Sequence, residues 1–295
     1  MALHPMKFDP AYTGNEFIGA TQDYEGAQVV IYGMPMDWTV SFRSGTRLGP
    51  ARVREVSIGL EEYSPYLDKH LEDVKYFDAG DIPLAFGNPG RSLEQIEEFV
   101  DKIVADGKFP LGIGGEHLVT YSPLKALHKK YPDLVVVQLD AHADLREQYE
   151  GEPLSHSAVI RLAARDFLNP KNIYQFGIRS GTREEFKWGR ENTNFYPFKV
   201  LEPLKKVLPE LQGRPVYVTV DIDVLDPAFA PGTGTAEPGG ITSAELFESI
   251  HAIAGAGINV VGFDVVEVAP GIDPSELSQI VASKLIREVL LGLVK

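Results

Sequence analysis

Apolar residues in this chain are concentrated in short runs, which are separated by amphipathic segments and by loops rich in Gly and Pro. A short run that is apolar at nearly every position is typical of a β-strand covered on both faces. The pattern predicts strands at residues 28–32, 74–77, 110–113, 134–139, 172–176, 216–220 and 259–263.

Amphipathic segments between these runs predict helices at residues 92–105, 123–130, 157–167, 243–254 and 275–293. Ser92 stands where the first of them would be capped. Because strands and helices alternate, we predict an α/β fold, a single-domain three-layer α/β/α sandwich with a mostly parallel central sheet of about eight strands. The domain is expected to comprise residues 1–295, with residues 1–26 as an N-terminal extension.

Acidic and imidazole side chains follow four of these runs. The sequence Asp140-Ala141-His142-Ala143-Asp144 comes after residues 134–139, and Asp221-Ile222-Asp223 comes after residues 216–220. His117 and Glu267 lie just beyond two further strands. Residues two apart in an extended chain project to the same side. Since ligands of parallel sheets bind beyond the carboxyl ends of the strands, we expect these side chains to converge at one rim.

Each fragment alone has an ordinary explanation, because a solvated loop or a turn cap uses the same residue types. Together they indicate a metal cluster, since so many buried carboxylates would repel one another strongly without cations. Oxygen-rich sites with some imidazole suit Mn²⁺, and Fe²⁺, Co²⁺ and Zn²⁺ stay open. Four carboxylates balance two divalent charges, so we predict two Mn²⁺ ions per chain, which could share an attacking hydroxide.

Composition narrows the choice of partners. The chain has 28 basic and 42 acidic residues, a formal charge of −14, which argues against nucleic acid or an anionic membrane and is compatible with a cationic substrate. It has no cysteine, which excludes disulfides, thiolate zinc sites and cysteine nucleophiles. No run approaches the roughly 20 apolar residues of a membrane span, and no signal-peptide pattern opens the chain. We expect a cytoplasmic protein.

Four motifs resemble the arginase/agmatinase (ureohydrolase) family, with the closest likeness to its bacterial agmatinase branch. They are Gly114-Gly115-Glu116-His117, the Asp140–Asp144 segment, Asp221-Ile222-Asp223-Val224-Leu225-Asp226-Pro227 and Glu267-Val268-Ala269-Pro270. Supporting segments are Ser44-Gly45-Thr46-Arg47-Leu48-Gly49-Pro50 and Gly232-Thr233-Gly234-Thr235. The motifs occur in the family's order and span nearly the whole chain.

The resemblance implies a role for each matching residue. One manganese would be bound by His117, Asp140, Asp144 and Asp221, and the other by His142, Asp140, Asp221 and Asp223. Glu267 would hold the substrate guanidinium with support from Thr235, Asp144 would carry a proton, and His156 would contact the substrate and shuttle protons. Two of these residues have ordinary alternatives. His156 could instead cap a helix or lie on the surface, and Glu267 could form a salt bridge with a nearby arginine.

The implied reaction is hydrolysis of agmatine to putrescine and urea by a metal-bridging hydroxide, in a homotrimer or homohexamer. Residues 150–156 carry two carboxylates and a proline where arginases have an Asn-containing segment, and residues 177–181 lack an acidic pair. Both departures favour a guanidino substrate without an α-carboxylate. Arg146 and Arg179 could bind a carboxylate, so guanidinobutyrate or another guanidino acid stays open. The alternatives are another ureohydrolase, acting on arginine, guanidinobutyrate or aminopropyl-agmatine, and a metal-stabilised binding protein without turnover.

Overall fold

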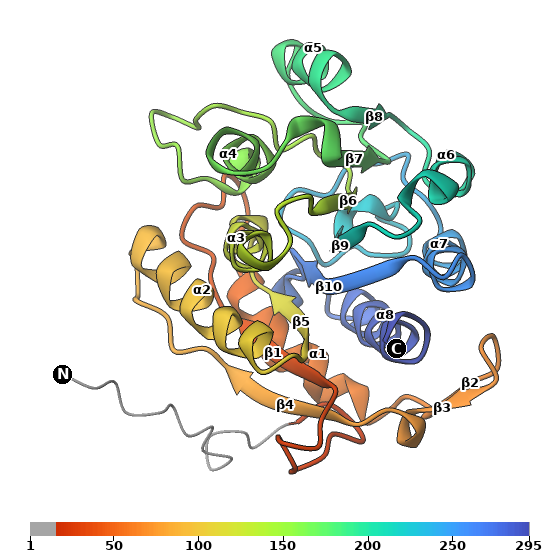
Figure 1. Cartoon of the computed structure of the whole chain (residues 1–295). Helices are drawn as coiled ribbons and strands as arrows, with labels where there is room; N and C mark the ends of the chain where they lie inside the picture. Colours follow the sequence, from red (N-terminus) through yellow and green to blue (C-terminus); the bar gives the residue numbers. More distant parts are fainter. Residues whose placement is uncertain (1–15, 295) are drawn as a thin grey trace.

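The computed structural model describes residues 16–294, so residues 1–15 of the predicted N-terminal extension lie outside the described part. Its centre is an eight-stranded sheet in the order β4-β1-β5-β10-β9-β6-β7-β8 (Figure 1). All pairings between its strands are parallel. The strands are β1 (Val29–Met34), β4 (Tyr76–Asp81), β5 (Phe109–Gly114), β6 (Val135–Leu139), β7 (Ile173–Phe176), β8 (Asn194–Tyr196), β9 (Pro215–Asp221) and β10 (Asn259–Val266).

Helices cover both faces of the sheet (Figure 1). One layer contains α2 (Pro89–Ala105), α3 (Tyr121–Lys130) and α4 (Val159–Asp166), with α5 (Arg183–Asn192) beside the edge strand β8. The other layer contains α1 (Gly49–Ser57), α6 (Leu201–Val207), α7 (Ser243–Gly255) and α8 (Leu277–Leu293). This arrangement confirms the predicted three-layer α/β/α fold.

The two helical layers explain why the strands are apolar at successive positions. In β1, Val29 and Ile31 belong to the core under α1 and α8, whereas Val30 and Tyr32 belong to the core under α2 and α3. All four side chains are fully buried. Adjacent residues of a strand point to opposite faces, so a strand covered on both sides has no position left for a solvated side chain.

The seven predicted strands are all present, with ends shifted by a few residues. The pattern did not predict β8, the small hairpin of β2 (Tyr63–Ser64) and β3 (Lys69–His70), or the helices α1, α5 and α6. These elements are short or rich in polar residues, so they lack the apolar periodicity on which the prediction rested. The proposed cap Ser92 is wrong: α2 begins earlier, and the side chain of Asn88 accepts a hydrogen bond from Arg91 N–H.

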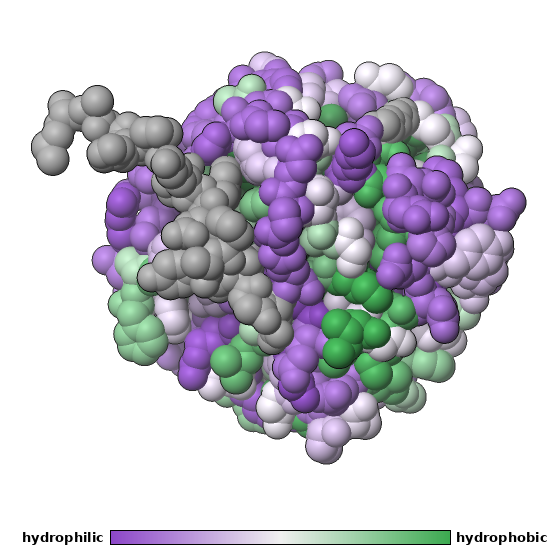
Figure 2. Space-filling model, turned by 90° about the horizontal axis from the view of Figure 1, so that it is seen from below, coloured by the Kyte–Doolittle hydropathy of each residue, from purple (hydrophilic) through white to green (hydrophobic). Residues whose placement is uncertain are grey.

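One face of the molecule can be followed in a space-filling view (Figure 2). Figure 2, which views the molecule from below Figure 1, shows mainly hydrophilic residues with hydrophobic ones in separate clusters. Among residues 16–294, no helix has the length and apolar character that crossing a membrane requires.

A buried ion cluster joins the chain's first helix to the edge of the sheet. Arg54 Nε lies 2.8 Å from Asp78 Oδ2, and Arg54 Nη1 lies 2.6 Å from Asp81 Oδ1. Asp78 Oδ2 also accepts the Phe17 N–H at 2.8 Å, which fastens the start of the described chain to β4. The Arg54 and Asp78 side chains are 3% and 0% exposed. Their charges are therefore compensated almost entirely by protein groups.

Replacing this arginine tests the cluster. Arg54→Met should lower the free energy of unfolding by about 3–5 kcal/mol, because Asp78 would remain buried without its counter-charge. Urea denaturation measures the loss, and Arg91→Met, which removes an exposed arginine paired with Glu94, is the matched control. Equal stability of the two variants would contradict a structural role for the buried cluster.

Candidate metal centre and active site

The acidic and imidazole residues lie where four neighbouring strands end. In the order β5-β10-β9-β6, the sheet places the segments that follow these strands side by side. His117 follows β5, Glu267 follows β10, Asp221 and Asp223 close β9, and Asp140 begins the segment after β6. The parallel arrangement therefore brings them to one rim, as the sequence predicted.

Two glycines allow the backbone before His117 to pass through a crowded place. A Cβ on Gly115 would lie 2.0 Å from Met36 O, and one on Gly114 would lie 2.5 Å from Val266 Cγ1. Gly115 N–H donates to Met34 O at 2.8 Å, and Glu116 N–H donates to Met36 O at 2.7 Å. The chain after β5 is thus fastened to the chain after β1, which fixes where His117 begins.

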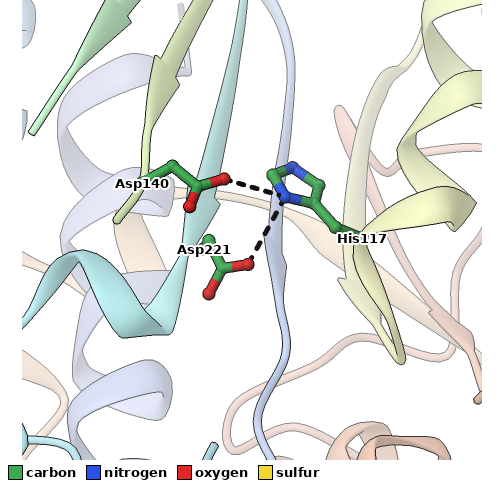
Figure 3. A group of neighbouring side chains, drawn as sticks. All are labelled: His117, Asp140 and Asp221. Atoms are coloured by element: carbon green, nitrogen blue, oxygen red, sulfur yellow. Dashed lines mark ion pairs between the residues drawn. The ribbon is translucent and has the colours of Figure 1, made fainter. Parts of the chain in front are cut away.

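His117 faces three carboxylates with one ring nitrogen. Its Nδ1 lies 3.1 Å from Asp140 Oδ2, 3.1 Å from Asp144 Oδ2 and 3.4 Å from Asp221 Oδ2. Figure 3 shows the Asp140 and Asp221 carboxylates converging on this ring. The His117 side chain is 1% exposed. The ligand atoms of His117, Asp140 and Asp221 all lie within 4.8 Å of one another, which is suitable for holding a metal ion.

A second group of the same kind shares Asp140. His142 Nδ1 lies 2.8 Å from Asp223 Oδ2 and 3.9 Å from Asp140 Oδ1. The ligand atoms of Asp140, His142 and Asp223 again lie within 4.8 Å of one another. Asp140 therefore turns one oxygen toward each histidine. Two adjacent groups that share a carboxylate are consistent with a binuclear metal site.

The electrostatics of the cluster fit a pair of divalent cations. Burial, together with Asp144 and Asp223, raises the pKa of Asp140 to about 7. Burial and the neighbouring carboxylates also raise the pKa of Asp221 well above its ordinary value. Within the described residues, His117 Nδ1 and Asp223 Oδ2 are buried atoms without a hydrogen-bond partner. Carboxylates packed in this way require a compensating positive charge. The two atoms without a hydrogen-bond partner both lie in the cluster and could bind a metal ion.

The ligand segments reach the site by turns, not by the extended backbone that we predicted. β6 ends at Leu139, and Asp144 adopts a left-handed conformation with φ 53°. Asp223 N–H donates to Asp221 Oδ1 at 2.9 Å and opens a short 3₁₀ turn. Glu267 is also left-handed, with φ 64°. Such backbone conformations are costly for residues other than glycine, and they persist where the surroundings require them.

A cavity of about 320 Å³ opens onto the cluster. His142, Asp144 and Asp221 line its floor, and the predicted substrate residues His156, Thr235 and Glu267 line it as well. Glu267 Oε1 accepts the His117 N–H at 2.8 Å and lies 3.4 Å from His156 Nδ1. His156 and Glu267 are 8% and 2% exposed. His156 is therefore a buried cavity residue, and the ordinary reading of it as a surface histidine is wrong.

Several polar residues that support the cluster were missed by the sequence reasoning. His117 Nε2 lies 3.0 Å from Thr219 Oγ1, which fixes the ring, and Gln138 Nε2 donates to Asp140 Oδ2 at 2.7 Å. Asp264 Oδ2 accepts hydrogen bonds from Thr120 and Tyr217 beside them. The signal was available, because Gln138, Thr219 and Asp264 are single polar residues inside otherwise apolar strands. A buried polar residue needs a hydrogen-bond partner, and the partners of Gln138 and Thr219 are the ligand candidates Asp140 and His117.

Arg179 does not point into the cavity as an anion-binding group. Its guanidinium donates to backbone carbonyl oxygens, at 2.7 Å to Asp223 O, 3.2 Å to Val224 O and 2.6 Å to Glu237 O. It thus holds the chain around Asp223, one of the metal-ligand candidates. Arg146 does line the cavity, and its Nε lies 3.7 Å from Glu185 Oε2.

Ser278 supports the loop that carries Thr235. Its Oγ donates to Asp273 Oδ2 at 2.9 Å and accepts the Gly232 N–H at 2.7 Å. A Cβ on Gly232 would lie 2.7 Å from Asp273 Cβ, so this approach requires glycine. The hydroxyl therefore fixes the start of the 232–235 loop.

The parallel sheet and the paired ligand groups at its rim define a metal-binding protein with an arginase-like α/β fold. The chain belongs to the arginase family, which matches residues 27–292. It is 66% identical to an agmatinase of Bacillus anthracis over 98% of this chain and 100% of that protein. An agmatinase of Bacillus subtilis is 63% identical with the same coverage. The crystal structure of agmatine ureohydrolase of Thermoplasma volcanium matches with a TM-score of 0.86 and 32% identity, over 95% of this chain and 94% of that one.

Metal content should separate the two groups. Asp223→Asn is expected to reduce the bound divalent metal from two ions to about one, because Asp223 belongs to one group only. Asp140→Asn should reduce both, because this carboxylate faces both histidines. Elemental analysis after gel filtration measures the stoichiometry, with the exposed Asp133→Asn as control. Equal loss of both ions in Asp223→Asn would contradict the assignment of this residue to one ion.

Proposed function

We propose that this chain is an agmatinase that hydrolyses the guanidinium group of agmatine to putrescine and urea. The observation that carries the proposal is the placement of Glu267. Its carboxylate lies in the cavity directly beside the backbone of the metal-ligand candidate His117. A planar cation held by this carboxylate would have its carbon next to the metal cluster. Similarity to agmatinases at 62–66% identity supports the same reaction.

The six ligand candidates would hold two Mn²⁺ ions. His117, Asp140, Asp144 and Asp221 would bind one ion, and His142, Asp140, Asp221 and Asp223 the other, with Asp140 and Asp221 shared. Bound divalent cations lower the pKa of water toward about 7 and so supply a nucleophile at neutral pH, and they stabilise developing negative charge. The geometry around Asp140 supports this partition, because its two oxygens face different histidines.

Glu267 and Thr235 would orient the substrate. Glu267 can accept paired, charge-assisted hydrogen bonds from two guanidinium N–H groups, which fixes the plane of the cation. Its left-handed backbone is held by its own N–H, which donates to Gly115 O at 2.8 Å. Thr235 lines the same cavity from the loop that Ser278 and Gly232 anchor. The carboxylate is therefore fixed before the substrate arrives, which lowers the cost of positioning.

Asp144 and His156 would move the protons. Asp144 lies both in the ligand cluster and on the cavity floor, so a carboxylate oxygen there can accept a proton from the nucleophile and pass it to the leaving amine. His156 Nδ1 faces the cavity at 3.4 Å from Glu267 Oε1 and can exchange a proton with the amine nitrogen. The amine then leaves as a cation, while urea is neutral.

The charges of the cavity favour agmatine over guanidino acids. Glu185, which is 4% exposed, lines the cavity together with the ligand carboxylates, and Arg146 is balanced by it. Arg179 is occupied by backbone carbonyls, so one of the two arginines that kept a carboxylate substrate open is unavailable. Glu150 and Glu152 are exposed on the segment that precedes the cavity residue His156, and they add negative charge to that part of the chain. A dication is attracted to such a cavity, and a substrate carboxylate is repelled.

We also propose that residues 1–295 act as a single cytoplasmic domain that assembles as a homotrimer or homohexamer. The packed pair α1 and α8 supports assembly, because apolar side chains at the ends of α1 and the start of α8 are exposed. They are Leu48, Ile58, Leu277 and Ile280, with exposed fractions of 52%, 76%, 38% and 41%. Light scattering after gel filtration measures the mass of the assembly.

A urea-release assay tests the function. Agmatine, arginine, guanidinobutyrate and aminopropyl-agmatine are compared in parallel with added Mn²⁺, and agmatine should give the highest kcat/KM. A preference for arginine or a guanidino acid would overturn the choice of substrate. No urea from any of the four would favour the binding protein without turnover.

Glu267→Gln tests the placement of the guanidinium. The variant keeps an oxygen that can accept the His117 N–H but loses the charge, so kcat/KM for agmatine should fall roughly 10- to 100-fold, the range for one lost charged hydrogen bond. Both manganese ions should remain bound. If the metal content falls instead, the carboxylate belongs to the metal site and not to the substrate.

A further inference from the structure

The loop of residues 37–45 after β1 is closed on itself. Asp37 Oδ2 accepts the Gly45 N–H at 2.9 Å, and both Asp37 oxygens lie 3.1 Å from Arg47 Nη1. Gly45 has φ 130°, a conformation that favours glycine. Asp37 is 6% exposed. These contacts make the loop a closed unit with Ser41 near its middle.

Four hydrogen bonds anchor this loop to the active site. Thr39 N–H donates to Glu116 Oε2 at 2.8 Å, and Thr39 Oγ1 accepts the His156 N–H at 3.0 Å. On the far side, Arg43 donates to Thr233 O and Gly234 O, both at 3.1 Å. The loop is therefore fixed against the residue before His117, against His156 and against the loop that carries Thr235.

Ser41 meets the imidazole of His156 with two groups. Its backbone N–H donates to His156 Nε2 at 3.2 Å, and its Oγ lies 3.0 Å from the same nitrogen. A backbone N–H can only donate, so Nε2 accepts, and the ring proton resides on Nδ1. That nitrogen faces Glu267 Oε1 at 3.4 Å inside the cavity. Ser41 thus selects the tautomer that directs the proton toward the substrate.

Ser41 lines the same cavity as His156 and is itself open to water. It is exposed, whereas His156 is 8% exposed. The charged groups that face the ring are the carboxylates of Glu267, Asp144 and Glu116. Burial lowers the pKa of His156, but these carboxylates outweigh it and raise the pKa above its ordinary value. A ring that gains and loses protons here needs a route to water on its Nε2 side.

We propose that Ser41 positions His156 and relays protons between bulk water and His156 Nε2. The inference rests on the proposed function, in which His156 serves the departing amine. As the Nδ1–H bond breaks and its proton forms an N–H bond on the amine, Nε2 takes the proton of Ser41 Oγ. Ser41 Oγ is reprotonated by bulk water. When the next water in the site ionises, one proton returns by the reverse route, so the cycle balances.

The backbone N–H of Ser41 resets the relay. After a forward transfer, Nε2 carries a proton that points toward this N–H, and two donors cannot share one hydrogen bond. The ring returns to the Nδ1–H form when Nδ1 takes the proton released by the next water in the site and the proton on Nε2 leaves through the serine hydroxyl. One residue thus supplies both the exchangeable proton and the fixed dipole that restores the resting tautomer.

The test uses the full-length manganese enzyme and the guanidino substrate that it turns over fastest. Ser41→Ala keeps the backbone N–H and removes the hydroxyl. We expect kcat to fall about tenfold, less than the roughly 10²–10⁴-fold contribution of a whole acid–base group, because water can partly replace the hydroxyl. KM, manganese content and Tm should be unchanged. Ser41→Thr should recover most of the rate, and Ser44→Ala, an exposed serine of the same loop, should match the wild type.

Three further measurements separate a relay from a purely structural role. With Ser41→Ala, kcat should rise with the concentration of a morpholine buffer at constant pH and ionic strength, whereas the wild type should not respond. In a His156→Asn background, adding Ser41→Ala should have no further effect, because the serine acts through this histidine. The pH profile of kcat should narrow in Ser41→Ala alone.

Each contrary result is distinct. A wild-type rate in Ser41→Ala, a lowered rate without buffer rescue, or additive effects with His156→Asn overturns the relay and leaves the proposed function standing. No urea from the wild-type enzyme with any of the four guanidino substrates overturns both.

Discussion

The compensation of buried negative charge is the constraint on which the rest of this structure depends. Four parallel strands end side by side, and two of them, β6 and β9, deliver Asp140, Asp144, Asp221 and Asp223 to one small volume. Carboxylates so placed destabilise the fold unless cations neutralise them. The supporting shell follows from the same need, since His117 and Asp140 are each held in place by a polar side chain from a strand interior.

The side of the cavity that faces the substrate has a different construction. Metal-ligand candidates follow strands of the central sheet, whereas His156, Thr235 and Ser41 lie on loops. Those loops gain rigidity from one another, through Thr39 with His156 and through Arg43 with the 232–235 loop. Loops fixed in this way can differ between relatives without disturbing the sheet, which suits a family whose members act on different substrates.

The sequence predicted the sheet and the ligand cluster well, because both follow from strong local signals. Apolar runs covered on both faces identify strands, and polar residues at their carboxyl ends must meet when the strands are parallel. It did not predict Ser41, Glu116 or Arg179, whose roles depend on contacts far apart in the chain. It also misjudged the backbone of residues 140–144, because spacing alone cannot show that Asp144 turns left-handed. Arg179 illustrates the limit: its charge suggested an anion site, but its contacts are with backbone carbonyls.

The close approach of Gly115 to Met36 limits how the loops around the cavity can be changed. Gly115 and Glu116 donate backbone hydrogen bonds to Met34 and Met36. These bonds join the segment that begins the 37–45 loop to the segment that carries His117. A change of loop length between Met36 and Asp37 would therefore displace the metal-ligand candidate His117 as well as the loop that contacts His156. To exchange substrate specificity between two relatives, both segments would have to be replaced together.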